Sequence, residues 1–504
     1  MTIPAAANQG EGKKSSRILL TGATGYIGRR LQDLLLKDEK VKLRIFVRNA
    51  RKATIPPETS IEIIEGSTLE PDALERALKN IDVAYYLIHS MGATGDFEAI
   101  DRISAKNFRE AAIRASVKRI IYLGGLGDKT TASKHLRSRL ETGEILSAHP
   151  TDIQTIWFRA GIIIGSGSAS FEIIRNLIQK LPMMITPRWV RTLTQPISVS
   201  DVLQYLYQAR DVAMDGNGIV DIGSEIMSFK DLMSRASRVM GLHRIYLPVP
   251  FLSPRLSSFW LRLFSPVPSR IARALVDGLK SETIIQNDNA RKYFPRISPI
   301  PFAQSVRLAL EDIDKNQILS SWCDSSAGAH CDLEPLPPSS QAVLTYQGRH
   351  SHQNTDPSRV FASIQKIGGR HGWFSANWLW RLRGLIDKLI GGPGLNRGRR
   401  DHTTLRIGDS LDFWKVADLR PDKRLLLSSQ MKLPGKAWLE FLVEEKDLIL
   451  KAHFLPHGIW GRLYWTLTKP FHLYLFPRMM RKIIQQAGNT PPTSPKRDHP
   501  GHLK

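Results

Sequence analysis

The first part of the chain alternates short apolar runs with longer amphipathic segments. The apolar runs are rich in β-branched residues and nearly continuous, which is typical of strands covered on both faces. They lie at 17–21, 43–47, 61–65, 83–88, 119–123 and 156–164. The segments at 26–36, 71–79, 97–115 and 133–146 have apolar residues three or four positions apart, as amphipathic helices do. Strands alternating with helices predict parallel βαβ units, so the expected fold class is α/β, with a doubly wound parallel sheet.

The pattern changes farther along the chain. Residues 227–319 are helical in period and punctuated by prolines, which predicts a small helical lobe packed onto the sheet. After a Ser- and Pro-rich stretch, alternating runs lie at 409–419, 424–433, 437–444 and 448–454, with helical segments at 357–367 and 470–486. Alternation with a period of two predicts an antiparallel sheet, so a second, α+β domain is expected.

These changes set the expected domain boundaries. The doubly wound domain with its lobe spans 17–322, a linker spans 323–340, and the second domain spans 341–487. The polar tails at 1–16 and 488–504 bury too little to order. Length agrees, because 504 residues exceed the roughly 250–300 that one hydrophobic core supports.

Composition bears on location. Hydrophobic residues make up 42% of the chain and charged residues 23%, as in folded soluble proteins. No apolar run reaches the roughly 18–20 residues that cross a bilayer, and the N-terminus has no signal-like stretch. Cys323 and Cys331 are too few for a disulfide framework, and no metal site is expected. We expect a cytoplasmic protein, with attachment to the inner face of a membrane as the alternative.

The charge is strongly basic and uneven. The formal net charge is +24, and residues 341–504 contain 27 basic against 12 acidic side chains. Such an excess favours anionic partners, either a phosphorylated cofactor, an acidic membrane surface or nucleic acid. The alternative is a solvated basic surface. Nucleic acid is not expected as a partner, because no known binding module accompanies the charge.

A glycine-rich run, TGATGYIG at 21–28, follows the first predicted strand and leads directly into a helix. Glycines permit the tight turn, the approach of a diphosphate and close packing of helix on strand, and the helix N-terminus attracts the anion. This context predicts a dinucleotide-binding turn rather than a structural glycine turn. The expected contacts are Gly22, Thr24, Gly25, Tyr26, Ile27 and Gly28.

The end of the second predicted strand indicates which dinucleotide is bound. Enzymes that use NAD place an acid there for the ribose 2′-hydroxyl, but this chain has Arg48. A guanidinium can pair with a 2′-phosphate, so NADP(H) is favoured over NAD(H). The alternative is that Arg48 is a solvent-facing loop charge.

These motifs resemble the extended or atypical branch of the short-chain dehydrogenase/reductase superfamily, whose NAD(P)-binding Rossmann domains include NmrA-like and epimerase-like members. The resemblance covers 17–310 and the pattern Gly-x-x-Gly-x-x-Gly. Where that branch has Gly-Asp against adenine, this chain has Gly66-Ser67, so the resemblance implies an adenine contact at Ser67. It also implies that His89 lies against the nicotinamide half, with a buried structural imidazole as the alternative.

Members of this superfamily that transfer hydride usually carry Tyr-x-x-x-Lys on the helix after the fifth strand. This chain has His135 and Arg139 at that spacing. Imidazole exchanges a proton near neutral pH and Arg can hold a ribose, so His135 and Arg139 are the candidate catalytic pair. The alternative is that the pair packs and the dinucleotide is bound without turnover. Tyr122 and Ser90 are the reserve candidates.

The second domain holds seven of the eleven tryptophans and the motifs GGRHGW (368–373), GDSLDFW (408–414) and MKLPGKAW (431–438). These motifs resemble a domain of unknown function fused to atypical short-chain reductases, which is itself similar to START-like helix-grip domains. The resemblance implies a pocket for a hydrophobic small-molecule ligand, with Arg397, Arg399 and Arg400 clamping an anionic head. The alternatives are tryptophans that fill the core and arginines in a solvated loop.

Two amphipathic segments, 252–264 and 471–482, would permit peripheral membrane contact, although packing in a core is the alternative. Three functions stay open at this point. The first is an NADP(H)-dependent oxidoreductase acting on an apolar carbonyl or enone substrate. The second is a non-catalytic NADP(H)-binding redox sensor, and the third is a hydrophobic-ligand binding protein.

Overall fold

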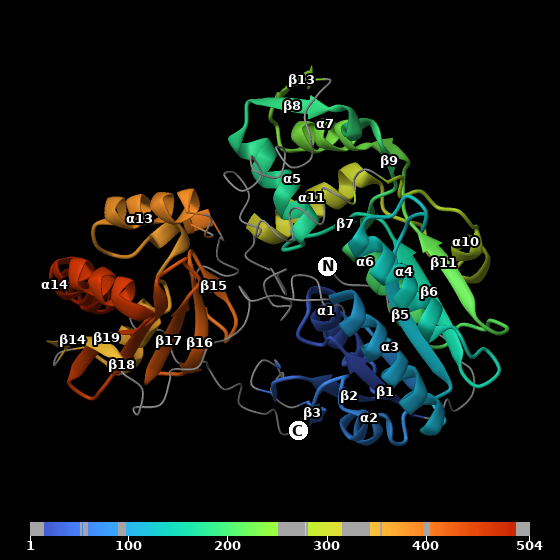
Figure 1. Ribbon diagram of the computed structural model, residues 1–504, viewed down its shortest axis with the longest axis horizontal. Coiled ribbons are helices and arrows are strands. Elements are labelled where there is room, and N and C mark those ends of the chain that lie inside the picture. The colour runs from blue at the N-terminus through green and yellow to red at the C-terminus, as the bar shows by residue number, and fades with distance from the viewer. Residues whose placement is uncertain are drawn as a thin grey trace, which may run out of the picture. The chain divides into compact units, whose positions relative to one another are not determined.

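A computed structural model gives the protein as two compact units, Met1–Asp332 and Leu333–Lys504 (Figure 1). The structure describes residues 15–50, 53, 59–88, 97–249, 278, 281–314, 343–352, 355–390, 392, 394–396 and 404–489. The features of the sequence analysis that lie outside these residues are His89, Ser90, the two cysteines, the linker, the segment 252–264, Arg397, Arg399, Arg400 and nearly all of both tails.

The first unit is built on a seven-stranded sheet in the order β11-β6-β5-β4-β1-β2-β3. Every pairing between neighbouring strands is parallel, which confirms the predicted doubly wound α/β class. The strands are β1 (Ser16–Thr21), β2 (Val41–Val47), β3 (Glu62–Glu65), β4 (Val83–Tyr86), β5 (Arg119–Gly125), β6 (Gln154–Ala160) and β11 (Gly218–Ile222). The helices beside them are α1 (Tyr26–Leu35), α2 (Pro71–Leu78), α3 (Phe97–Arg114), α4 (Lys134–Leu146) and α6 (Val199–Gln208).

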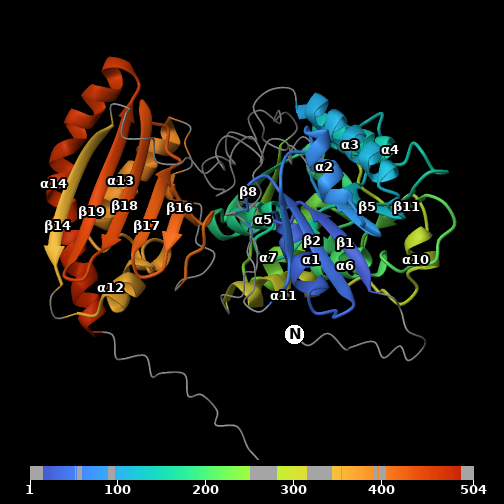
Figure 2. The same ribbon diagram turned by 90° about the horizontal axis from the view of Figure 1, so that it is seen from below.

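Helices cover both faces of this sheet, as the near-continuous apolar strands predict (Figure 2). Leu20 of β1 belongs to the same apolar cluster as Leu31 of α1. Its neighbour Leu19 belongs to a different cluster, together with Phe108 of α3. Successive side chains of one strand are therefore buried on opposite faces.

The predicted strand at 156–164 differs from the structure. The expected strand at 156–164 is two strands, because β6 ends at Ala160 and β7 (Ile163–Ile164) pairs with β10 (Ile197–Ser198) in a separate small sheet. The chain turns at Gly161, where a Cβ would lie 2.7 Å from the carbonyl oxygen of Gln195. This turn directs the chain out of the main sheet.

A second lobe of the first unit encloses its own apolar cluster. Its further elements are α5 (Ala169–Lys180), β8 (Met183–Pro187), η2 (Arg188–Arg191), β9 (Leu193–Thr194), β12 (Met227–Ser228), α7 (Phe229–Val239), β13 (Ile245–Val249) and α11 (Phe302–Asp314), and α10 (Asn289–Tyr293) lies against β11. The cluster contains Ile164 and Phe171 as well as Leu232 and Val306, so the lobe is assembled from residues on both sides of Met227.

The second unit is a six-stranded sheet in the order β14-β19-β18-β17-β16-β15, and every pairing is antiparallel, as predicted. Its strands are β14 (Leu344–Ser351), β15 (Ser410–Leu411), β16 (Trp414–Arg420), β17 (Arg424–Ser429), β18 (Gly435–Val443) and β19 (Asp447–Pro456). Its helices are α12 (Pro357–Ile364), η4 (Gly369–His371), α13 (Asn377–Leu389), η5 (Gly394–Asn396) and α14 (Gly458–Asn489). α12 and α14 bury apolar side chains in one cluster with the strands.

The tryptophans of this unit are divided between its core and its surface. Trp373, Trp414 and Trp438 are buried, and Trp373 stacks on Trp380 with ring centroids 4.7 Å apart. The indole N–H of Trp373 donates to Asp412 at 2.8 Å. These contacts show tryptophans filling a core, whereas Trp378 and Trp460 are exposed. The START-like resemblance and a ligand pocket stay predictions.

Candidate dinucleotide-binding site

The glycine-rich run forms a tight turn between β1 and α1. Gly22 has a φ of +69°, and a Cβ there would overlap the carbonyl oxygen of Leu87, the residue after β4. The N–H of Gly25 donates to the carbonyl oxygen of Gly22 at 2.8 Å and closes the turn. A Cβ on Gly28 would overlap Gly22, so this position allows α1 to pack against the turn.

Among the residues that the structure describes, the N-terminus of α1 has neither a side-chain cap nor an acidic residue in its first turn. Gly25 is the N-cap residue, and no side chain among the described residues caps this helix end. The first turn contains no acidic residue, so the partial positive charge of the helix end is not neutralised from within α1. Such an end offers backbone N–H groups to a diphosphate.

The side chains of Tyr26 and Ile27, the first two residues of α1, are both engaged away from the turn. A Cβ on Gly165 would lie 2.5 Å from the Tyr26 hydroxyl oxygen, so the tyrosine side chain points toward the second lobe. Burial raises the pKa of Tyr26 to about 12, and the Arg30 guanidinium lies 5.0 Å from its ring centroid. The Ile27 side chain packs against the apolar cluster of the sheet. The tyrosine therefore stays neutral and serves packing.

The turn lies where the order of the strands reverses. β1 has β2 on one side and β4 on the other, and the chain crosses from β3 over β1 to reach β4. Thr21 links the ends of β1 and β4, because its hydroxyl donates to the carbonyl oxygen of Tyr85 at 2.8 Å and accepts from the N–H of Leu87 at 3.1 Å. Open α/β sheets bind ligands in the crevice outside the strand ends at such a position.

Arg48 and Ser67 follow the next two strands of this edge. Arg48 is exposed and comes directly after β2. The N–H of Ala50 donates to Glu65 at 3.0 Å, which holds the loop after β2 against the end of β3. The Ser67 hydroxyl accepts from the N–H of Leu69 at 3.2 Å, in the turn before α2. Arg48 is thus accessible to a ligand, whereas the Ser67 hydroxyl also serves its own turn.

α4 carries the predicted catalytic pair at the end of β5. The Arg139 guanidinium donates to the carbonyl oxygen of Leu123 at 2.6 Å, and a Cβ on Gly125 would lie 3.7 Å from Arg139 Nε. Burial, helped by the Arg139 charge, lowers the pKa of His135 to about 3. His135 is therefore a neutral imidazole at neutral pH. The Tyr122 hydroxyl donates to the carbonyl oxygen of Arg139 at 2.9 Å, and burial raises its pKa to about 12.

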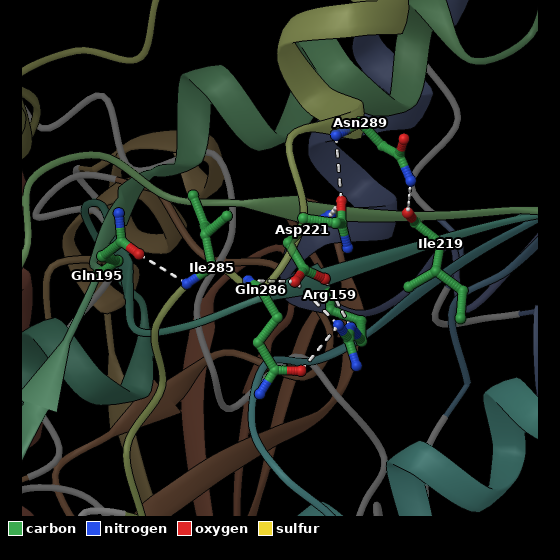
Figure 3. A network of polar contacts seen from close by, with 8 residues as sticks. Arg159, Gln195, Ile219, Asp221, Ile285, Gln286 and Asn289 are labelled. Atoms are coloured by element: carbon green, nitrogen blue, oxygen red, sulfur yellow. Dashed lines mark hydrogen bonds and ion pairs between the residues drawn. The ribbon is translucent and has the colours of Figure 1, made fainter.

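A buried ion pair at the same edge was not foreseen from the sequence (Figure 3). Arg159, near the end of β6, binds Asp221 of β11 through two contacts, Nε to Oδ1 at 2.6 Å and Nη2 to Oδ2 at 2.9 Å. The backbone N–H of Gln286 also donates to Asp221, at 2.8 Å. Asn289 donates to the carbonyl oxygen of Ile219 at 2.8 Å. These contacts hold residues 286–289 along β11.

Comparisons with known proteins identify both parts of the chain. Residues 22–152 match the family described as NAD(P)H-binding, and residues 343–479 match the family described as protein of unknown function DUF2867. The first unit therefore contains a segment similar to NAD(P)H-binding domains, and the second unit contains a segment similar to DUF2867.

Solved structures similar to the chain cover about three fifths of it. The Citrobacter sp. triphenylmethane reductase complexed with NADP(H) has 20% identity and a TM-score of 0.47, over 58% of this chain and 100% of that one. The Bordetella bronchiseptica enzyme WbmG in complex with NAD has 16% identity and a TM-score of 0.48, over 62% of this chain and 98% of that one. No helix among the described residues is both long enough and apolar enough to cross a membrane.

Proposed function

We propose that the protein is an NADP(H)-dependent oxidoreductase that reduces an apolar carbonyl or enone substrate. The observation that carries the proposal is the turn at 22–28, where an uncapped helix end faces the position at which the strand order reverses. The family match to NAD(P)H-binding domains over 22–152 supports the same use of this turn.

The choice of NADP(H) rests on Arg48. Its guanidinium follows β2, the strand beside β1, and is exposed. An adenosine 2′-phosphate is a dianion that can accept two parallel N–H bonds from such a guanidinium.

In this proposal His135 acts as a hydrogen-bond donor rather than as a proton carrier. A bound nicotinamide supplies the hydride. A neutral imidazole N–H beside the substrate carbonyl stabilises the negative charge that develops on its oxygen, and it does so best where water is excluded. His135 is partly buried, and this burial lowers its pKa to about 3. The proton that completes the alcohol then comes from water, because neutral His135 holds no extra proton.

Arg139 positions this donor. Its guanidinium is anchored on the carbonyl oxygen of Leu123, and it lies one helical turn from His135 on the same side of α4. Its positive charge helps to keep His135 neutral. The same burial that desolvates the imidazole makes an apolar substrate the better match for this part of the unit.

The test is binding followed by turnover on the full chain. NADPH and NADH are titrated by calorimetry, and NADPH oxidation is then followed by absorbance across a panel of apolar aldehydes, ketones and enones. The expected result is tighter binding of NADPH and turnover that His135→Ala reduces at least tenfold, as for loss of one preorganised donor. Absence of binding by either nucleotide would overturn the proposal.

The second candidate is an NADP(H)-binding redox sensor without turnover. It is favoured by the same low pKa of His135 and by the engagement of the Tyr122 hydroxyl with the Arg139 carbonyl, since neither side chain supplies a proton at neutral pH. Binding of NADPH without oxidation of any substrate on the panel would select this candidate.

A further inference from the structure

The second unit exposes an apolar stripe along α13. Its members recur at intervals of three and four residues, so they lie on one face of the helix. They are Trp378, Leu382, Leu385, Ile386 and Leu389, and Trp378 and Leu389 are each 65% exposed. The opposite side of α13 is partly buried, because Leu379 and Trp380 pack against the core. The stripe is thus the outward face of a helix whose inward face is already in use.

α14 carries a second stripe of the same kind. The exposed members are Ile459, Trp460, Leu463, Leu467, Phe471 and Tyr474, with Trp460 75% exposed. Farther along α14, Phe476, Met479 and Ile483 are buried in the core of the unit. The second half of α14 is therefore held in the core, while one face of its first half is exposed.

The two helices are neighbours on the same side of the sheet (Figure 1). The Arg383 guanidinium of α13 lies 5.9 Å from the ring centroid of Tyr464 in α14. Trp380 and Trp465 pack against the same apolar cluster. We call the two stripes together the α13–α14 surface.

Every exposed charge on these helices is positive. α14 contains no Asp or Glu, and its exposed ionic side chains are Arg462, Lys469, Arg478, Arg481 and Lys482. The single acid of α13, Asp387, is buried and accepts from the N–H groups of Gly394 at 2.8 Å and Lys432 at 2.9 Å. On these two helices, apolar stripes that include Trp, Phe and Tyr are therefore accompanied by exposed cations and by no exposed acid.

We propose that the α13–α14 surface docks on the anionic face of a lipid bilayer. Exposed apolar area is unfavourable in water, so a patch of this kind is stabilised when it is covered. Acyl chains cover the apolar side chains, headgroups accommodate the aromatic rings, and each cation is attracted to an anionic leaflet. A second copy of the chain fits less well, because a symmetric contact would bring the same cations together. This docking goes beyond the proposed reductase activity and does not depend on it.

The test is sedimentation of the full chain with vesicles. Vesicles of phosphatidylcholine mixed with phosphatidylglycerol are expected to carry the protein down, and vesicles of phosphatidylcholine alone to carry much less. Trp460→Gln combined with Leu467→Gln is expected to lower the partition coefficient at least tenfold with no change of charge. Lys469→Gln is expected to lower it about fivefold on the anionic vesicles only.

A matched control comes from the first unit. Ile103→Gln combined with Ile226→Gln removes two apolar side chains that are 50% and 57% exposed, and is expected to leave the partition coefficient unchanged. Circular dichroism establishes that each variant is folded. The proposal is overturned if the protein does not bind anionic vesicles, or if the control variant loses as much binding as Trp460→Gln with Leu467→Gln. If vesicle binding is absent and the wild-type protein is a dimer that Trp460→Gln with Leu467→Gln dissociates, the surface is instead a contact between two copies of the chain.

Discussion

In the proposed function, the choice between the two nicotinamide dinucleotides depends on Arg48. We expect Arg48→Ala to raise the Kd for NADPH about tenfold or more, because a charge-assisted bond to the 2′-phosphate contributes about 1.5–3 kcal/mol. The Kd for NADH should hardly change, since NADH has no phosphate at that position. Calorimetric titration of both nucleotides measures the ratio. Lys42→Ala removes an equal charge from the exposed amino end of β2 and should change neither Kd. Equal weakening of both nucleotides by Arg48→Ala would remove Arg48 from the recognition of the 2′-phosphate.

His135 gives the site a distinctive pH dependence. Its pKa is about 3 in the folded protein against 6.5 for an ordinary imidazole. If neutral His135 donates the hydrogen bond, kcat should show no ionisation near pH 6.5. As the pH falls, His135 of the unfolded chain is protonated near pH 6.5, whereas His135 of the folded chain stays neutral down to about pH 3. The contribution of His135 to the free energy of unfolding is therefore full above pH 6.5 and is lost as the pH falls toward 3. We expect His135→Gln to lessen the fall in unfolding free energy between pH 7 and pH 4.5, measured by urea titration. A rate that declines above pH 6.5 would instead identify an imidazolium acid.

Single residues could be assigned from the sequence only where the relevant partner is local. Gly22 and Gly28 are separated by one turn and the start of a helix, so their spacing alone indicates a dinucleotide turn. Arg159 and Asp221 are 62 positions apart, and nothing near either residue reveals the other. His135 was placed by its spacing from Arg139, but its depressed pKa follows from burial, which the local pattern does not contain.

At the scale of elements, the pairing of β6 with β11 depends on the Arg159–Asp221 pair. Asp221 has no exposed area, and removing one partner of a buried pair costs about 3–5 kcal/mol. We expect Asp221→Ala to lower the free energy of unfolding by that amount. Arg159→Ala combined with Asp221→Ala should cost less than the two single changes together, since no unpaired charge remains. Glu141→Ala breaks the more exposed pair with Arg102 and should cost under about 1 kcal/mol. Additive losses for Arg159 and Asp221 would contradict the coupling.

The elements that the sequence predicted are those with a regular period. The βαβ units of the first 146 residues appear within a few residues of their expected bounds, because strand and helix each carry an apolar pattern of their own. β11 was missed because Asp221 interrupts its short apolar run. The Asp221 carboxylate is stabilised inside the protein by its ion pair with Arg159, which the local sequence does not reveal. β14 was missed because its outward polar residues dilute the pattern of a strand at the sheet edge. α14 begins at Gly458 rather than at 470, since the helix continues through Pro470 and Pro477.

At the scale of the whole molecule, the candidate dinucleotide site and the candidate membrane-docking surface belong to different units. The dinucleotide turn, Arg48 and the α4 pair all belong to the first unit, whereas the exposed apolar stripes flanked by cations belong to the second. The basic excess that the sequence shows in residues 341–504 thus accompanies the proposed lipid contact and not the cofactor site. Composition predicted an anionic partner for this part of the chain, but only the exposure of α13 and α14 separates a membrane surface from a phosphorylated ligand.

This division predicts how the chain unfolds. Each unit has apolar clusters of its own, so calorimetry of the full chain should resolve two transitions. In the proposed function NADPH binds the folded first unit, and a ligand that binds only the folded state stabilises it by about 2.7 kcal/mol at a hundredfold excess over Kd. One transition should therefore move upward while the other stays in place. Arg48→Ala should reduce that shift at the same NADPH concentration, whereas Trp460→Gln with Leu467→Gln should leave it intact. A single transition that moves as a whole would show instead that the two units unfold as one cooperative body.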